Sequence, residues 1–316
     1  MQDGRLERDC SVFRAASTVG DAWSWLVLRE ALFNDVRRFD QFQQRLGIAR
    51  STLTNRLGRL VAAQMLQRNG SDYVPTPRGL DFLACLLAAM HWGDRWSPDE
   101  DGPPVQVSHL GCGQPMHAEL SCKHCDRPVV AQEVSFDRAP EPMRRPDGPR
   151  RRNRIPGLDL LERGRPCSIA RTLQVIGDLW SALIIQECFL GVHRFDQFQQ
   201  RLAIASNILS HRLARLVELD ILAAPPPDHP HDGYRLTDKG IALYPVPLAM
   251  LTWGDRWCAV GEPPMTLTHT PCGCRLRAVL GCSECGRRVE RVDLRWDKSV
   301  PSEDGAVAAT AGRYRR

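Results

Sequence analysis

The spacing of apolar residues predicts a short series of amphipathic helices in each half of the chain. In the first helix of each half, apolar residues recur three and four positions apart, which is the helical period. These positions are Trp23, Leu26, Val27 and Ala31 in the first half and Trp180, Leu183, Ile184 and Cys188 in the second. A second short helix follows in both halves, marked by Phe39, Phe42 and Leu46 and by Phe195, Phe198 and Leu202.

A third helix follows a short turn in each half. The turn passes through Gly47-Ile48 or Ala203-Ile204. The helix has leucines at i, i+4 and i+7, which places them on one buried face. They are Leu53, Leu57 and Leu60, matched by Leu209, Leu213 and Leu216. Two helices joined in this way predict a helix-turn-helix.

The two halves are copies of one another. The nine residues from Arg38 to Leu46 recur without change at Arg194 to Leu202, and Trp92-Gly93-Asp94-Arg95-Trp96 recurs at 253–257. A period of roughly 160 residues is the size of a domain with an appendage, so the chain is a tandem duplication.

Each unit continues with a predicted wing and a final helix. Asn69-Gly70-Ser71-Asp72 is a strong hairpin turn, and the residues after it predict a strand that ends at a helix N-cap, which is the threonine or its neighbour. In unit two the corresponding tip, 225–233, is longer and rich in proline. The fold class expected is therefore mainly α with small β wings (α+β), in two winged helix-turn-helix domains.

Domain boundaries follow from the repeat and from composition. We expect winged helix-turn-helix units at 8–98 and 158–259, zinc-ribbon-like modules at 104–136 and 264–296, a basic Pro/Gly linker at 137–157 and a flexible tail at 297–316.

Composition limits the function classes. The net charge of +5 is mild, no apolar run is long enough for a membrane span, and the polar N-terminus does not resemble a signal peptide. We therefore expect a cytoplasmic protein without a membrane partner. The sequence shows no phosphate loop, no nucleophile with its base and no open metal site, so we expect no enzymatic activity.

The third helix carries the candidate chemistry for reading DNA. Between Asp40 and Asp72 there are five arginines and no acidic residue, and between Asp196 and Glu218 there are three arginines and none. A surface that faces phosphates requires such a gap in negative charge, while asparagine and arginine can read adenine and guanine edges. The candidate DNA-binding residues are Arg50, Ser51, Thr52, Asn55, Arg56 and Arg59 in unit one and Ser206, Asn207, His211, Arg212 and Arg215 in unit two.

These motifs together resemble the HxlR family of bacterial winged helix-turn-helix regulators. The matching features are an N-terminal Cys, Val/Ile-Gly-Asp-x-Trp, Arg-Phe-Asp-Gln-Phe, the leucine and arginine pattern of the third helix, and Leu-Thr-Asp-Lys-Gly at 236–240. The likeness covers about residues 10–96 and 167–257. It implies a sequence-specific regulator that binds double-stranded DNA. Since family members are typically homodimers of one unit, it also implies a covalent pseudo-dimer, with further self-association possible. Both units have alanine, Ala49 and Ala205, where the family commonly has the serine that precedes the recognition helix.

Each unit ends in a cysteine-rich appendage that the common family pattern lacks. Two short ligand pairs separated by about nine residues fit a tetrahedral zinc ribbon, so we expect structural Zn²⁺ in each module. The candidate ligands are His109, Cys112, Cys122 and Cys125 in module one and His269, Cys272, Cys274, Cys282 and Cys285 in module two. Module two has five candidates for four places, so Cys274 could replace His269 or stay free. A redox-switched zinc site and reduced thiols without metal are the alternatives.

Two further functions stay open. Some relatives in the family sense electrophiles or oxidants through an N-terminal cysteine near a helix start, where the thiol pKa is lowered, so the resemblance implies a redox-sensing alternative at Cys10 and Cys167. A buried structural cysteine is the simpler interpretation. The duplicated modules could instead make the chain a zinc-dependent protein-interaction adaptor. The retained Arg56, Arg59, Arg212 and Arg215 favour DNA.

Overall fold

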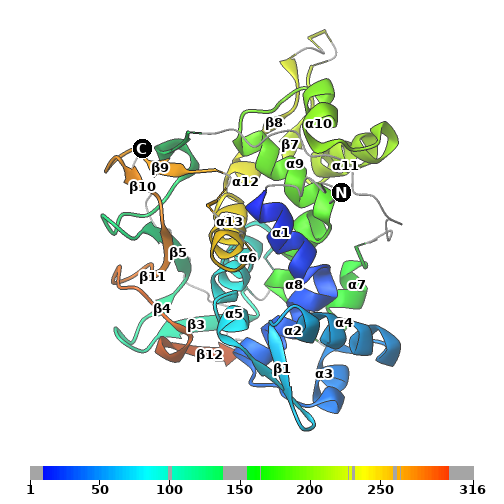
Figure 1. Cartoon of the computed structure of the whole chain (residues 1–316), viewed down its shortest axis with the longest axis vertical. Coiled ribbons are helices and arrows are strands. Elements are labelled where there is room, and N and C mark those ends of the chain that lie inside the picture. The colour runs from blue at the N-terminus through cyan, green and yellow to red at the C-terminus, as the bar shows by residue number, and fades with distance from the viewer. Residues whose placement is uncertain are drawn as a thin grey trace, which may run out of the picture.

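A computed structural model describes most of the chain (Figure 1). The described residues are 10–98, 102–137, 155–163, 165–226, 228–229, 232–258, 262–263 and 265–298. Almost all of the predicted basic linker and residues 299–316 of the predicted tail lie outside these ranges. Asp297 and Lys298 belong to a strand, so the regular structure of module two continues two residues past its expected end.

Apart from α7 at the start of unit two, the described parts of the two units have the same order of elements, and the predicted fold class is confirmed. Unit one contains α1 (Ser11–Val19), α2 (Ala22–Phe33), α3 (Phe39–Leu46), α4 (Arg50–Ala62), β1 (Leu66–Asn69), β2 (Asp72–Pro75), α5 (Pro77–Leu80) and α6 (Leu83–Trp96). Unit two contains α7 (Leu158–Leu161), α8 (Ser168–Ile176), α9 (Leu179–Phe189), α10 (Phe195–Leu202), α11 (Ser206–Glu218), β7 (Leu222–Ala223), β8 (Arg235–Leu236), α12 (Asp238–Ile241) and α13 (Pro245–Trp257). The leucines predicted for the inner face of α4 and α11 are all fully buried.

Local sequence explains the turns of each helix-turn-helix and wing. The turn between α3 and α4 uses Gly47 in the left-handed region (φ 59°), and unit two places Ala203 there (φ 46°). A non-glycine residue is uncommon in this conformation, so unit two carries some backbone strain at this turn. After each wing, the hydroxyl of Thr76 or Thr237 accepts a hydrogen bond from a backbone N–H of the next short helix, as the sequence predicts.

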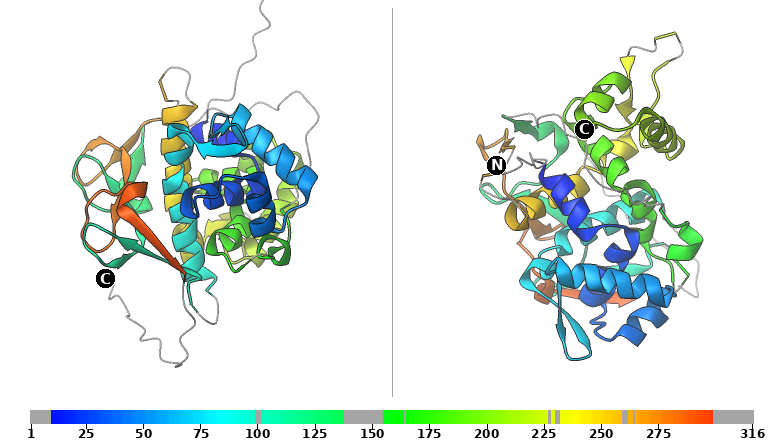
Figure 2. Two further views of the ribbon diagram at one scale, coloured as in Figure 1. Left: turned by 90° about the horizontal axis from the view of Figure 1, so that it is seen from below. Right: turned by 45° about the vertical axis from the view of Figure 1, so that its right-hand side comes forward.

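The two units pack against each other at the Trp-Gly-Asp-Arg-Trp ends of α6 and α13, where helices of the two units cross. Helix α8 packs on α6, and α1 packs on α13. Glycine is needed at each crossing, because a Cβ on Gly93 would lie 2.1 Å from the carbonyl oxygen of Ser168, and one on Gly254 would lie 2.2 Å from that of Ser11. Figure 2 shows these helices stacked at the centre of the molecule. This repeated motif is therefore packing between units.

Tryptophans add a reciprocal hydrogen bond to this interface. The indole Nε1 of Trp92 donates to the carbonyl oxygen of Lys239 at 3.0 Å, and that of Trp253 donates to the carbonyl oxygen of Arg78 at 3.0 Å. The same residue type thus anchors each final helix to the short helix after the wing of the other unit. The two hydrogen bonds are related by the repeat, so each unit contributes the same kind of contact to the interface between them.

The two cysteine-rich modules are intertwined. Module one contains β3 (Val105–His109), β4 (Pro115–Met116), β5 (Ala118–Cys122) and β6 (Val134–Phe136); module two contains β9 (Leu267–His269), β10 (Cys274–Arg275), β11 (Ala278–Cys282) and β12 (Leu294–Lys298). The longer strands pair across modules, all antiparallel: β5 with β11, β3 with β12 and β6 with β9. Only β3–β4 and β9–β10 pair within a module among the described strands. The sequence predicts two separate ribbons, and the structure has one joint body instead.

Within the described ranges, no single helix has the length and apolarity of a membrane span. Helices α8 and α9 together would reach that length, but they bend by 78° at the break between them.

Candidate nucleic-acid interface and metal-ligand clusters

The outer faces of α4 and α11 are exposed and free of acidic side chains until the last residue of α11. Both helices lie on the side of the molecule away from the modules (Figure 1). In α4 the exposed residues are Arg50, Ser51, Thr54, Asn55, Gly58 and Ala62. In α11 they are Ser206, Asn207, Ser210, His211, Ala214 and Glu218. Most of these side chains are small or polar, which allows close approach to another surface.

Exposure separates the predicted DNA-binding residues into two groups. Arg50, Ser51, Asn55, Ser206, Asn207 and His211 are exposed, whereas Thr52, Arg56, Arg59, Arg212 and Arg215 are half-buried. Thr54 and Ser210, which are not among the predicted residues, also lie on the exposed face, one helical turn beyond Arg50 and Ser206. The spacing of the buried leucines was a usable signal, because it places these two residues on the opposite, exposed face of the helix.

Two of the predicted base-reading arginines are held by buried carboxylates of their own unit. The Nε of Arg56 donates to Asp21 at 2.8 Å, and the Nε of Arg212 donates to Asp178 at 3.1 Å. Each aspartate is the N-cap of the preceding long helix, α2 or α9. In this structure both guanidinium groups therefore fix the recognition helix to the body of the unit, and the sequence expectation that they face bases needs revision.

The next arginine along each helix also turns inward. The Arg59 guanidinium lies beside Gly20, where a Cβ would come within 2.8 Å of it. In unit two, Nη2 of Arg215 lies 3.5 Å from the side-chain oxygen of Gln174. Both arginines therefore contact the end of α1 or α8.

The start of each recognition helix has no side-chain cap. Ala49 and Ala205 occupy the N-cap positions, so no side chain accepts from the first N–H groups of α4 and α11. Free N–H groups at a helix start favour an anion through hydrogen bonding and the helix dipole. Arg50 in the first turn of α4 lies over the Phe39 ring at 5.1 Å and adds positive charge there.

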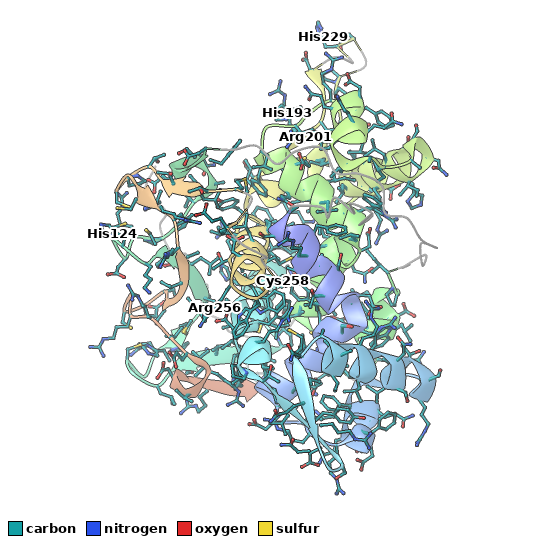
Figure 3. The ribbon with its side chains drawn as sticks, in the orientation of Figure 1. His124, His193, Arg201, His229, Arg256 and Cys258 are labelled. Carbon is teal, nitrogen blue, oxygen red and sulfur yellow. The ribbon has the colours of Figure 1, made fainter. Side chains whose placement is uncertain are left out.

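The wings differ between the two units. The hairpin of β1 and β2 pairs four residues on each strand, whereas β7 and β8 pair only two. Figure 3 shows His229 at the outer end of the longer tip that joins β7 to β8. The two wings therefore differ in the length of their paired strands, while the predicted difference in reach stays a prediction, since part of the tip lies outside the described residues.

The metal-ligand candidates gather in two clusters, each drawn from both modules. One cluster consists of His109 and Cys112 of module one with Cys282 and Cys285 of module two. The other consists of Cys122 and Cys125 of module one with His269 and Cys272 of module two. In each cluster the four donor atoms lie within 4.8 Å of one another. Cys274 belongs to neither cluster, whereas His269 lies with three of the candidate thiols.

The two N-terminal cysteines are buried across the unit interface. The thiol of Cys10 donates to the side-chain oxygen of Gln186 at 3.3 Å, and burial raises the pKa of Cys10 although backbone hydrogen bonds lower it. Cys167 accepts from the N–H of Ala170 and lies near the buried Arg29 of unit one, whose guanidinium donates to Glu30. The lowered thiol pKa that the sequence suggests for helix starts therefore does not hold for Cys10.

This geometry defines a class of protein: two winged helix-turn-helix units whose recognition helices are exposed and whose cores pack against each other. The family model for HxlR-like helix-turn-helix proteins matches residues 18–101 and 175–262, together more than half of the chain. The chain therefore belongs to the HxlR-like helix-turn-helix family, and it contains two copies of the family unit.

Similar proteins are transcriptional regulators. The chain is 39% identical over 139 residues to the uncharacterised HTH-type transcriptional regulator Rv3095 of Mycobacterium tuberculosis, which covers 42% of this chain and 85% of that protein. It is 32% identical over 91 residues to the HTH-type transcriptional regulator YodB of Bacillus subtilis, covering 28% of this chain and 81% of that protein. A solved structure of PA1607, described as a candidate transcription factor, is 36% identical and covers 48% of this chain and 94% of that one, with a TM-score of 0.29. The family and these relatives support a DNA-binding transcriptional regulator.

Proposed function

We propose that this chain is a sequence-specific regulator of the HxlR type that binds double-stranded DNA as a covalent pseudo-dimer. The observation that carries the proposal is the pair of exposed, polar recognition helices, α4 and α11, on one side of a single packed core. In a homodimer two chains supply these helices, and here one chain supplies both. Binding chromosomal DNA would place the chain in the cytoplasm.

The base-reading residues are the exposed ones. Asn55 and Asn207 would pair with adenine, and His211 would donate to or accept from a base edge. Ser51, Thr54, Ser206 and Ser210 are short enough to contact a base or a phosphate. Arg50 and the uncapped helix starts would bind phosphate, while the arginines paired to Asp21 and Asp178 hold the helices in place.

The two recognition helices present different surfaces, so the operator should be asymmetric. Thr54-Asn55 in unit one stands where Ser210-His211 stands in unit two, and Ser51 stands where Asn207 stands. Two different readers prefer two different half-sites, whereas identical readers would prefer a palindrome.

Selection of bound fragments from the genome of origin, followed by footprinting with measured stoichiometry, tests the proposal. We expect one chain per site and protection of two unlike half-sites about one helical turn apart. A short palindrome bound by two chains, each through one unit, would overturn the pseudo-dimer. Binding that does not depend on sequence would overturn sequence-specific recognition.

We further propose that the two cysteine and histidine clusters hold structural Zn²⁺. Each cluster offers three thiols and one imidazole, a donor set typical of structural zinc. Four protein donors leave no open position for water, so we assign the sites no catalytic role and regard the chain as a regulator without enzymatic activity. Metal analysis of protein purified without chelators should give about two zinc ions per chain, and a metal-free folded protein would contradict this.

A redox-sensing role loses support at Cys10, because its thiol donates to the neutral Gln186 and burial raises its pKa. Cys167 stays a candidate by its position as the N-cap of α8. Alkylation of the folded chain tests this role, and no reaction at Cys167 would remove it. The exposed polar faces of α4 and α11 favour DNA over an adaptor that has lost it.

A further inference from the structure

We propose that each metal ion is bound jointly by the two modules, so that two ions cross-link the two halves of the pseudo-dimer. The inference rests on the proposed zinc binding and adds which ligands share an ion. One ion would be bound by the His-Cys pair of module one and the Cys-x₂-Cys pair of module two. The other ion would be bound by the Cys-x₂-Cys pair of module one and the His-Cys pair of module two. The sequence alone favours ligand pairs that close within a module, so the two arrangements make different predictions.

The distances within each cluster fit a tetrahedral zinc site. Zinc–sulfur bonds of about 2.3 Å place two sulfurs about 3.8 Å apart in a tetrahedron. The sulfurs of Cys112 and Cys282 are 3.9 Å apart, and those of Cys122 and Cys272 are 3.9 Å apart. A disulfide would need about 2 Å, so these are not bonded pairs. Each short distance joins one module to the other.

The histidine donors are placed in the same way. The Nδ1 of His109 lies 3.3 Å from the sulfur of Cys112 in its own module and 3.3 Å from that of Cys285 in the other. The Nδ1 of His269 lies 3.4 Å from Cys272 and 3.3 Å from Cys125. Both imidazoles are buried, and a buried ring nitrogen facing two sulfurs is best satisfied by a shared cation.

Backbone hydrogen bonds already form the four knuckles that would hold the ions. The carbonyl oxygens of His109 and His269 accept from the N–H of Gly113 and Gly273 at 2.8 Å. The carbonyl oxygens of Cys122 and Cys282 accept from the N–H of Asp126 and Gly286 at 2.9 Å. Each ligand pair therefore lies on a tight turn within its own module. The two arrangements differ only in which turns face one another.

Pairing of strands between the modules supports the shared arrangement without reference to the cysteine side chains. β5 ends at Cys122 and β11 ends at Cys282, and the two strands pair antiparallel over five residues each. Antiparallel pairing sends the two Cys-x₂-Cys knuckles to opposite ends of the two-stranded sheet. Each knuckle there meets the His-Cys turn of the other module, which β6–β9 and β3–β12 hold in place.

Zinc counts in paired cysteine variants of the full chain distinguish the two arrangements. Cys122→Ser/Cys272→Ser removes two ligands of the same shared site, so we expect about one zinc to remain. Cys112→Ser/Cys122→Ser removes one ligand from each shared site, so we expect close to none. Ions bound within single modules would give the opposite result: none for the first variant and about one for the second. That reversal would overturn the inference, while a wild-type chain without zinc would overturn the proposed zinc binding itself.

A measurement on the unmodified chain covers the case in which a variant does not fold. The protein is treated with increasing chelator, its free thiols are alkylated, and the labelled cysteines are identified by mass spectrometry. We expect Cys122, Cys125 and Cys272 to become reactive together, and Cys112, Cys282 and Cys285 to do so together. Release of Cys112 together with Cys122 and Cys125, while Cys272 stays protected, would contradict sharing between modules.

Discussion

The guanidinium of Arg212 is bonded to the carboxylate of Asp178, with Nε 3.1 Å from Oδ1, and this pair joins the recognition helix of unit two to the first turn of α9. The carboxylate also accepts from the N–H of Trp180 and from the N–H and hydroxyl of Ser181. Arg56 and Asp21 make the same connection in unit one. Each recognition helix is therefore joined to the core of its unit by an ion pair whose carboxylate is buried and whose guanidinium is half-buried.

Arg212→Ala should lower stability and weaken DNA binding without changing base preference. Removal of the guanidinium leaves Asp178 with its helix-capping bonds and no cation, which we expect to cost about 2 to 3 kcal/mol in the free energy of unfolding. Denaturant unfolding and gel shifts at fixed salt on a set of single-base operator variants measure both effects. A selective loss of preference at one base position, with stability unchanged, would show that Arg212 reads a base instead.

Asn55→Ala and His211→Ala should each change the preference at one half-site. Both side chains are exposed at the centre of their recognition helices, so their loss should not unfold the chain. We expect a loss of about 1 to 3 kcal/mol for the preferred base and little effect elsewhere. Selection from a randomised operator shows whether the two variants relax different halves of the site. Relaxation at the same half by both would argue against one reader per half-site.

Gly254→Ala should destabilise the contact between the units. The new Cβ would meet the backbone of Ser11, which cannot move aside as a flexible side chain could, so we expect a loss of about 3 kcal/mol or more. Gly58→Ala is the matched control, since a Cβ there has open space and unit two already has Ala214 at that position. The control should gain about 0.5 to 1 kcal/mol from helix propensity. Thermal unfolding of both variants checks the contrast, and equal behaviour would show that the crossing is looser than described.

Asp94→Asn should remove a dependence of stability on pH. Burial raises the pKa of Asp94 to about 6, although the hydroxyl of Ser168 and the charge of Arg171 lower it. Between an unfolded pKa near 4 and about 6, the folded chain binds more protons at this site than the unfolded chain, so stability should fall as pH rises through this window and stay lower above it. Asparagine keeps the acceptor for Ser168 and carries no charge. The variant should therefore be more stable than the wild type at pH 7 by about 2 kcal/mol, and the advantage should vanish near pH 4.

Urea unfolding at pH 4, 5, 6 and 7 measures this advantage. An advantage that stays constant with pH would trace the effect to packing, and a less stable variant at pH 7 would show that the ionised carboxylate is well paired.

The fold of each unit could be predicted because it rests on local patterns. The leucine stripe, the turn at Gly47 and the threonine caps each depend on residues close together in sequence. The repeat then transfers every prediction from one unit to the other. The glycine and tryptophans at the end of α6 indicated packing, but their partners lie in the other unit, so the pattern alone could not name Ser168 or Lys239.

The arrangement of the candidate sites was harder to predict because it depends on long-range pairing. Spacing identified the candidate ligands of both clusters. Two equivalent modules, however, allow the ligand pairs to combine either within a module or between modules. Strand register favours the second combination, and it depends on pairing between distant residues. Similarly, an arginine on a recognition helix suggests contact with a base when only the helix is considered. The carboxylates that bind Arg56 and Arg212 lie far away in the sequence. A signal was present: Asp21 and Arg56 are 35 residues apart and Asp178 and Arg212 are 34 apart, so both copies keep the same pair at nearly the same separation.

Because both units and both paired modules belong to one polypeptide, the pairing of the two proposed DNA readers does not depend on dilution. In a dimer of separate chains, the fraction assembled falls as the protein becomes scarce, and related chains can trade subunits. Here β5 and β11 belong to one polypeptide, so their effective concentration is set by the chain that joins them. On the proposed function, a few molecules per cell would remain fully paired, and the combination of two unlike readers would be inherited as one gene product.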